Sequence, residues 1–143
     1  MFNFFKKKTK NLTNDKDNLL SKTTSLLIHA AKIDENFSDN EREIIKKTLL
    51  KLGIKETELD NFINEAEFKE NDSNQILDFT KEIKNASDEF KTKIVETLWQ
   101  IIYSNNKEDI YESNLMRRLS GLLYLDAKTV GNIKEKVKKE LSK

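Results

Sequence analysis

The stretch that decides the fold is LLSKTTSLLIHAA, from Leu19 to Ala31. Its apolar and small side chains recur at steps of three and four residues, which is the spacing of residues on one face of an α-helix. That face consists of Leu19, Leu20, Thr23, Leu26, Leu27, Ala30 and Ala31. The pattern predicts a helix with one buried face that ends near Ile33.

Six further stretches repeat this helical spacing. Their apolar faces consist of Ile44, Ile45, Leu49 and Leu52; Leu59, Phe62, Ile63 and Ala66; Ile76, Leu77, Phe79, Thr80 and Ile83; Phe90, Ile94, Val95, Leu98, Trp99, Ile101 and Ile102; Leu115, Met116, Leu119, Leu122 and Leu123; and Val130, Ile133, Val137 and Leu141. The chain has no proline and only three glycines to interrupt helices. The predicted fold class is therefore all-α, a single bundle of about seven helices.

Capping residues mark where several of these helices begin or end. Gly53 follows the second helix and can adopt the left-handed conformation that a helix C-terminus favours. Ser73, in the polar break KENDSN, is expected to cap a short fourth helix, and Ser87 to cap the fifth. The sixth helix should start at about Asp109 and the last after Asp126.

Length and charge suggest one domain that does not bind nucleic acid. The 143 residues are enough for a single hydrophobic core, which we expect over residues 15–143, after a flexible basic tail at residues 1–14. The net charge of +1 argues against nucleic-acid binding, which needs a basic excess. No apolar run approaches the roughly 20 residues of a membrane-spanning helix. The cytoplasm is the simplest compartment for such a chain.

The chain is poor in the side chains that most enzymes use. It has no cysteine, so disulfides, thiolate nucleophiles and zinc–thiolate sites are excluded. Its one histidine, His29, lies beside the first apolar face rather than among carboxylates at metal-ligand spacing, and we expect it to be structural. These absences predict a protein that is not an enzyme.

An internal repeat with an offset of 71 residues (112 − 41) runs through the chain. It pairs Glu112 with Glu41, Leu98 with Leu27, Ile102 with Ala31, Asn105 with Asp34, Met116 with Ile45 and Leu123 with Leu52. Each half should therefore be a long helix, a polar turn and a second helix. The two helical hairpins should pack on each other.

The turn KIDENFSDNERE, residues 32–43, has two interpretations: a cation site or a capped helix start. The first, third and fifth positions of a calcium-binding EF-hand loop are matched by Asp34, Asn36 and Ser38. Asp39 stands where that loop needs glycine, and Ile45 where it needs glutamate. The turn is therefore not expected to be an EF-hand.

Helix capping accounts for part of this turn. The Ser38 hydroxyl can accept from the amide of Glu41, whose carboxylate can reach back to the Ser38 amide and form a capping box. Asp34 is not explained in this way, because a carboxylate at a helix C-terminus needs a partner such as a turn amide, a basic side chain or a cation. The candidate ligands for a divalent cation such as calcium are Asp34, Glu35, Asp39, Glu41 and Glu112.

Three motifs together resemble the tellurite-resistance TerB family, whose domain also forms the N-terminal part of some membrane-anchored J-domain co-chaperones. They are D-x-x-φ-S-x-x-E at residues 34–41, LWQIIYSNN and ESNLMRRLSGLL. The family's second motif, L-W-x-I-A-Y-A-D-G-x-L-x-x-x-E-x-x-L-I-R-R, is matched by Leu98, Trp99, Ile101, Tyr103, Glu112, Leu115, Arg117 and Arg118. The chain departs from it at Asn105, Asn106 and Glu108.

The resemblance implies an all-helical, largely non-enzymatic module with an acidic surface suspected of binding divalent cations. The family is linked to bacterial stress resistance and to complexes at the inner membrane. We therefore expect an interaction module that presents an acidic face to protein partners. The alternatives are a divalent-cation sensor built on Asp34 and Glu41, and a carboxylate-dependent hydrolase. Arg117 or Arg118 is expected to bridge to Asp34.

The first ten residues, MFNFFKKKTK, combine phenylalanines with lysines. The residues that could contact a membrane surface are Phe2, Phe4, Phe5, Lys6, Lys7 and Lys8. Phenylalanines that enter the headgroup region and lysines that meet anionic lipid would form a weak anchor, peripheral at the inner membrane. The other interpretation, which we favour, is a disordered basic tail.

Overall fold

The computed structural model describes residues 18–32, 37–73, 76–104 and 110–141. These residues form seven α-helices and one short 3-10 helix, with no strand among them. The elements are a first helix over residues 18–31, α2 (Asp39–Lys51), η1 (Glu56–Glu58), α3 (Leu59–Ser73), α4 (Ile76–Ile83), α5 (Asp88–Ser104), α6 (Ile110–Leu122) and α7 (Ala127–Leu141). The prediction of an all-α fold is confirmed.

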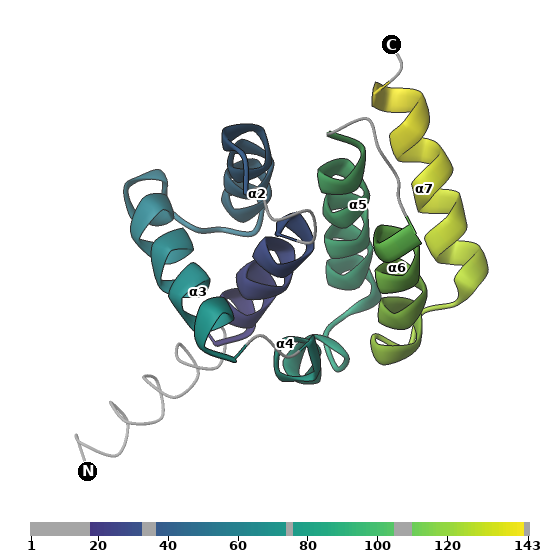
Figure 1. The fold of residues 1–143 in the computed structure, drawn as a ribbon, viewed down its shortest axis with the longest axis horizontal. Coiled ribbons are helices and arrows are strands. Elements are labelled where there is room, and N and C mark those ends of the chain that lie inside the picture. Colours follow the sequence, from purple (N-terminus) through teal and green to yellow (C-terminus); the bar gives the residue numbers. More distant parts are fainter. Residues whose placement is uncertain (1–17, 33–36, 74–75, 105–109, 142–143) are drawn as a thin grey trace.

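The helices pack in two groups that meet at α5 (Figure 1). The first helix, α2 and α3 lie on one side, and α5, α6 and α7 lie on the other. Helix α5 packs against both α2 and α7, and α6 packs against α4 and α7. One continuous core of buried apolar side chains joins the two groups, with members from all seven helices. The molecule is therefore a single packed unit over the described residues.

The first helix is buried on nearly every side, which differs from the single buried face that its spacing predicted. Its hydroxyl groups have partners: Thr24 Oγ1 donates to the carbonyl of Leu20 at 2.7 Å, and Ser25 Oγ donates to the carbonyl of Ala66 in α3 at 2.9 Å. Ile28 is fully buried as well. A buried hydroxyl costs little once it is hydrogen-bonded, so this helix can occupy the interior despite its polar residues.

Two of the predicted helix starts are confirmed by their capping hydrogen bonds. The amide of Phe90 donates to Ser87 Oγ at 3.2 Å, which caps α5. The amide of Lys128 donates to Asp126 Oδ1 at 3.0 Å, which caps α7. The predicted cap Asp109 lies outside the described residues.

The predicted helix break at KENDSN is wrong for residues 69–73, because α3 continues to Ser73. Ser73 is thus the last residue of α3 rather than the cap of α4. Contacts to the first helix hold this end of α3: Lys69 Nζ donates to Ser21 Oγ at 3.1 Å, and Lys32 Nζ donates to Glu70 Oε2 at 3.2 Å. Tertiary packing here overrides the weak helix propensity of a polar stretch.

The second helices of the two predicted halves have equal lengths and the predicted offset. Helices α2 and α6 each contain 13 residues, and their first residues are 71 positions apart (110 − 39). Both follow a longer segment that packs centrally, the first helix in one half and α5 in the other. The helix boundaries therefore agree with the predicted repeat.

The C-termini of α2 and α6 also repeat each other. Their closing backbone hydrogen bonds run from Gly53 to Leu50, from Ile54 to Leu49, from Tyr124 to Gly121 and from Leu125 to Ser120, at 2.8 to 3.2 Å. Each pair of bonds forms a Schellman motif, whose central residue has a positive φ. Gly53 has φ 105° and Tyr124 has φ 58°. The predicted role of Gly53 is confirmed, while Tyr124 occupies the matching position at a steric cost.

No helix within the described ranges is both long enough and apolar enough to span a membrane. The predicted tail at residues 1–14, with its phenylalanines and lysines, lies outside those ranges.

Candidate functional site

The turn before α2 contains the predicted capping box. The amide of Glu41 donates to Ser38 Oγ at 3.2 Å, and Glu41 Oε1 accepts from both the amide and the hydroxyl of Ser38 at 2.9 Å. Glu41 is only 2% exposed. Because a cap of this kind contributes about 1 kcal/mol to helix stability, these contacts give Glu41 a structural role.

The structure describes only part of the predicted cation site. Asp34 and Glu35 lie outside the described residues, as does the side chain of Glu112. Of the other two candidates, Asp39 is exposed and Glu41 belongs to the capping box. Among the described side chains, no group of three or more histidine, aspartate or glutamate residues could hold a metal ion. A site that includes Asp34 stays a prediction.

An ionic cluster around the buried carboxylate of Glu70 joins the end of the first helix to α3. Glu70 is 4% exposed; its Oε1 lies 3.3 Å from His29 Nδ1, and its Oε2 accepts from Lys32 Nζ at 3.2 Å. Lys32 also donates to Asn71 Oδ1 at 2.7 Å, and the His29 ring packs at 6.1 Å from the Phe79 ring. Each polar group in the cluster has a partner, so the cluster ties two helices together.

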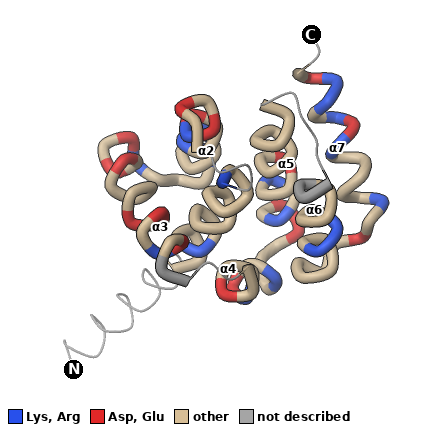
Figure 2. The backbone as a smooth tube through the Cα atoms, in the orientation of Figure 1, with Lys and Arg blue, Asp and Glu red and all other residues tan. Residues whose placement is uncertain are grey.

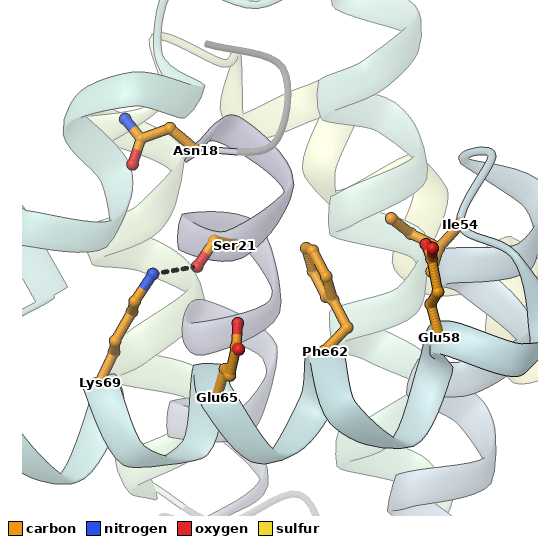
Figure 3. A pocket seen from close by; sticks show the side chains of 7 residues that line it. All are labelled: Asn18, Ser21, Ile54, Glu58, Phe62, Glu65 and Lys69. Carbon is orange, nitrogen blue, oxygen red and sulfur yellow. Dashed lines mark hydrogen bonds between the residues drawn. The ribbon is translucent and has the colours of Figure 1, made fainter. Parts of the chain in front are cut away.

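A groove lies between the first helix and α3 (Figure 3). Its volume is about 360 Å³, and we call it the acidic groove. It is lined by Asn18, Ser21, Ile54, Glu58, Phe62, Glu65 and Lys69. The half-buried ring of Phe62 points into it between the carboxylates of Glu58 and Glu65. The ammonium group of Lys69 is held by the Ser21 hydroxyl at 3.1 Å.

The surface around this groove is strongly acidic. Residues 56–73 contain seven acidic side chains and one basic side chain, Lys69. Within the described ranges, neither Glu58 nor Glu65 forms an ion pair or a side-chain hydrogen bond. Their carboxylates are exposed, so both remain available to a cationic partner.

Asp60, on the same helix, is already neutralised by α2. Its Oδ1 lies 3.1 Å from Lys46 Nζ and 3.8 Å from Arg42 Nη2. The hydrogen bond and negative charge of Asp60 raise the pKa of Lys46 above its ordinary value. Asp60 therefore links α2 to α3, whereas Glu58 and Glu65 supply the open negative charge.

The opposite end of the molecule is basic (Figure 2). Helix α7 contains five lysines and two glutamates. The predicted interaction residues Arg117 and Arg118 are exposed on α6, and Arg117 lines a second hollow of about 370 Å³ beside Trp99. The predicted bridge from these arginines to Asp34 lies outside the described residues. Arg117 thus belongs to the basic end of the molecule.

Sequence reasoning missed the acidic groove and the Glu70 cluster. The density of acidic residues between Glu56 and Asp72 is a signal that could have indicated the acidic surface. No local signal connects Glu70 to His29, because 41 residues separate them. Phe68, exposed to 74% on α3, was also not predicted.

The chain matches the model of a known family. The model of the family described as tellurite resistance protein TerB matches residues 21–135. This range begins within the first helix, contains α2 to α6 and ends within α7. Searches of curated proteins and of solved structures gave no match.

Proposed function

The chain belongs to the TerB family, and from this premise we propose that it is a non-enzymatic interaction module linked to tellurite resistance. It works by presenting the acidic groove and the adjoining surface of η1 and α3 to a protein partner. The proposed setting is the cytoplasm, including the face of the inner membrane. The family supports the link to tellurite resistance, and the surface supports a binding role.

The observation that carries this proposal is the pairing of open negative charge with an apolar side chain in one concave surface. Phe62 is flanked by Glu58 and Glu65, which lack ion-pair partners within the described residues. Binding surfaces typically combine an aromatic anchor with a charged rim that selects the partner. The groove has both parts.

The partner that fits this surface carries basic and apolar side chains close together. An apolar side chain would enter the groove against Phe62 and Ile54, which line it. Lysine or arginine side chains would then meet Glu58 and Glu65 at the rim. Charge at the rim mainly raises the association rate and the specificity, so binding should weaken as salt concentration rises.

Charge reversal tests this proposal. Glu58→Lys with Glu65→Lys should abolish the tellurite resistance that the wild-type chain restores to cells lacking it. The matched control is Glu135→Lys with Glu140→Lys, which makes the same charge change on exposed residues of α7. The control should retain resistance, and circular dichroism should show that both variants fold.

A photoreactive side chain at Phe62 identifies the partner in the same cells. It should give a crosslinked product that the groove variant loses and the α7 variant keeps. Equal resistance in both variants, or turnover of a substrate that depends on Glu41, would contradict the proposed function.

A further inference from the structure

Two lysines from different elements face one exposed tyrosine at the turn between α6 and α7. The Nζ of Lys91, on α5, lies 5.9 Å from the centre of the Tyr124 ring, and the Nζ of Lys84, just after α4, lies 6.0 Å from it. Tyr124 is 72% exposed. Residues 84–91 and the turn after α6, which lies 33 positions further along the sequence (124 − 91), therefore bring two cations and an aromatic ring to one place.

The backbone of Tyr124 is strained. Its φ of 58° lies in the left-handed region, which residues with a Cβ rarely adopt. The matching position in the first half of the repeat is Gly53, which closes α2 with the same hydrogen bonds and no side chain. Ending the helix thus does not require a tyrosine. Strained residues of this kind cluster at functional sites.

Lys91 is a buried cation without an acidic partner in the described part of the chain. Lys91 is only 5% exposed. Within the described residues, no carboxylate lies within 4.0 Å of its Nζ. Burying a charged group is costly unless an opposite charge or hydrogen bonds compensate it. The Tyr124 ring supplies part of this compensation as a cation–π contact.

The nearest acidic side chains in the sequence do not neutralise this site. Four acidic residues lie within three positions of Lys84, Lys91 or Tyr124 in the sequence: Glu82, Asp88, Glu89 and Asp126. None of them forms an ion pair with either lysine among the described contacts, and all four are exposed. The N-terminus of α5, three residues before Lys91, adds the positive end of a helix dipole. The two ammonium groups and the helix N-terminus therefore favour an anion between them.

We propose that Lys84, Lys91 and Tyr124 form a binding site for a small phosphate monoester. A phosphate group carries between one and two negative charges at neutral pH and has three strong acceptor oxygens. The flexible lysine stems allow both ammonium groups to donate to one phosphate, and burial of Lys91 strengthens its bond. The exposed Tyr124 ring offers a flat surface to the organic part of the ester.

The test is a titration of the full chain with phenyl phosphate at constant ionic strength, in which backbone-amide NMR peaks are measured at each concentration. We expect saturable shifts at residues 84–91 and 123–126. Lys91→Met and Tyr124→Gly should each weaken binding by about tenfold or more. Lys81→Met, which removes an exposed lysine of α4, should leave the affinity unchanged.

Both variants should remain folded, so loss of binding is interpretable. Tyr124→Gly relieves the strained φ, and Lys91→Met removes a buried charge while keeping an apolar side chain of similar length. Equal shifts with sodium chloride at the same ionic strength would overturn the proposal, as would unchanged affinity in Tyr124→Gly. The site and the acidic groove share no residue, so each proposal can fail without the other.

Discussion

At the scale of single residues, the structure contains two kinds of polar interaction. Ser38 and Glu41 stabilise each other across three positions of one turn, so their partnership can be recognised from the sequence. Glu70 instead meets His29 and Lys32 across about forty positions. Local pairs follow from chain geometry, whereas distant pairs depend on how the helices pack.

Removal of the Glu70 carboxylate should destabilise the fold. Glu70→Ala removes the buried carboxylate that His29 and Lys32 share, and we expect the free energy of unfolding to fall by about 2 kcal/mol. The control is Glu67→Ala, since the Glu67 side chain is about one-third exposed and pairs with Lys32 at 3.6 Å. Its cost should stay below about 0.5 kcal/mol. Urea unfolding measures both, and equal costs would refute the role of burial.

At the scale of secondary-structure elements, α2 and α6 end with the same backbone hydrogen bonds although the residues at their ends differ. Both helices close with a Schellman motif at the same place in the repeat, although one uses glycine and the other tyrosine. At the end of α3 the polar sequence predicts a loop, but the backbone is helical. Contacts of Lys69 and Glu70 with residues of the first helix and its end stabilise this turn. Neighbouring elements therefore decide where a helix with weak signals ends.

Two glycine substitutions should have opposite effects on stability. Gly53→Ala places a side chain at φ 105° and should cost about 1 kcal/mol, although no atom lies within 4 Å of the added Cβ. Gly121→Ala lies inside α6, also meets no atom within 4 Å, and should stabilise the protein by about 0.5 to 1 kcal/mol. Thermal unfolding of both variants measures the difference. A loss of stability in both variants would show that the difference in backbone conformation does not decide the sign of the effect at these positions.

At the scale of the whole molecule, a net charge of +1 conceals an uneven distribution. Acidic residues gather on η1 and α3, and lysines gather on α7 (Figure 2). The proposed phosphate site lies between α5 and the end of α6. It is built from different elements than the acidic groove, which lies between the first helix and α3. Surfaces of opposite sign on one small domain attract ligands of opposite charge to different faces.

The less favoured interpretation of the first ten residues, a membrane anchor, predicts that they attach the protein to anionic membranes. Deletion of Met1 to Lys10 is expected to abolish flotation with vesicles that contain anionic lipid. Replacing Lys6, Lys7 and Lys8 by glutamine should weaken binding by about 3 kcal/mol, since each lysine near such a surface contributes about 1 kcal/mol.

The control for this experiment makes the same charge change on α7. Glutamine in place of Lys136, Lys138 and Lys139, all exposed, should leave flotation unchanged. Equal flotation of the full chain and the deleted chain would refute the predicted anchor. Flotation lost only in the α7 variant would assign membrane contact to the basic end.

The sequence by itself determined the all-α class, most helix positions, the repeat with its offset of 71 residues and the caps at Ser38 and Ser87. These features depend on residues within about four positions of each other, or on a pattern that recurs along the chain, and such relations are visible in one dimension. The family resemblance rests on the same local motifs.

Only the tertiary structure decided how distant segments meet. It continued α3 to Ser73, buried the first helix on most sides, joined Glu70 to His29 and built the acidic groove around Phe62. It also brought Lys91 to Tyr124. These results depend on the angles at which helices pack and on which side chains lose contact with water, and neither quantity is set by the neighbours of a residue in the sequence.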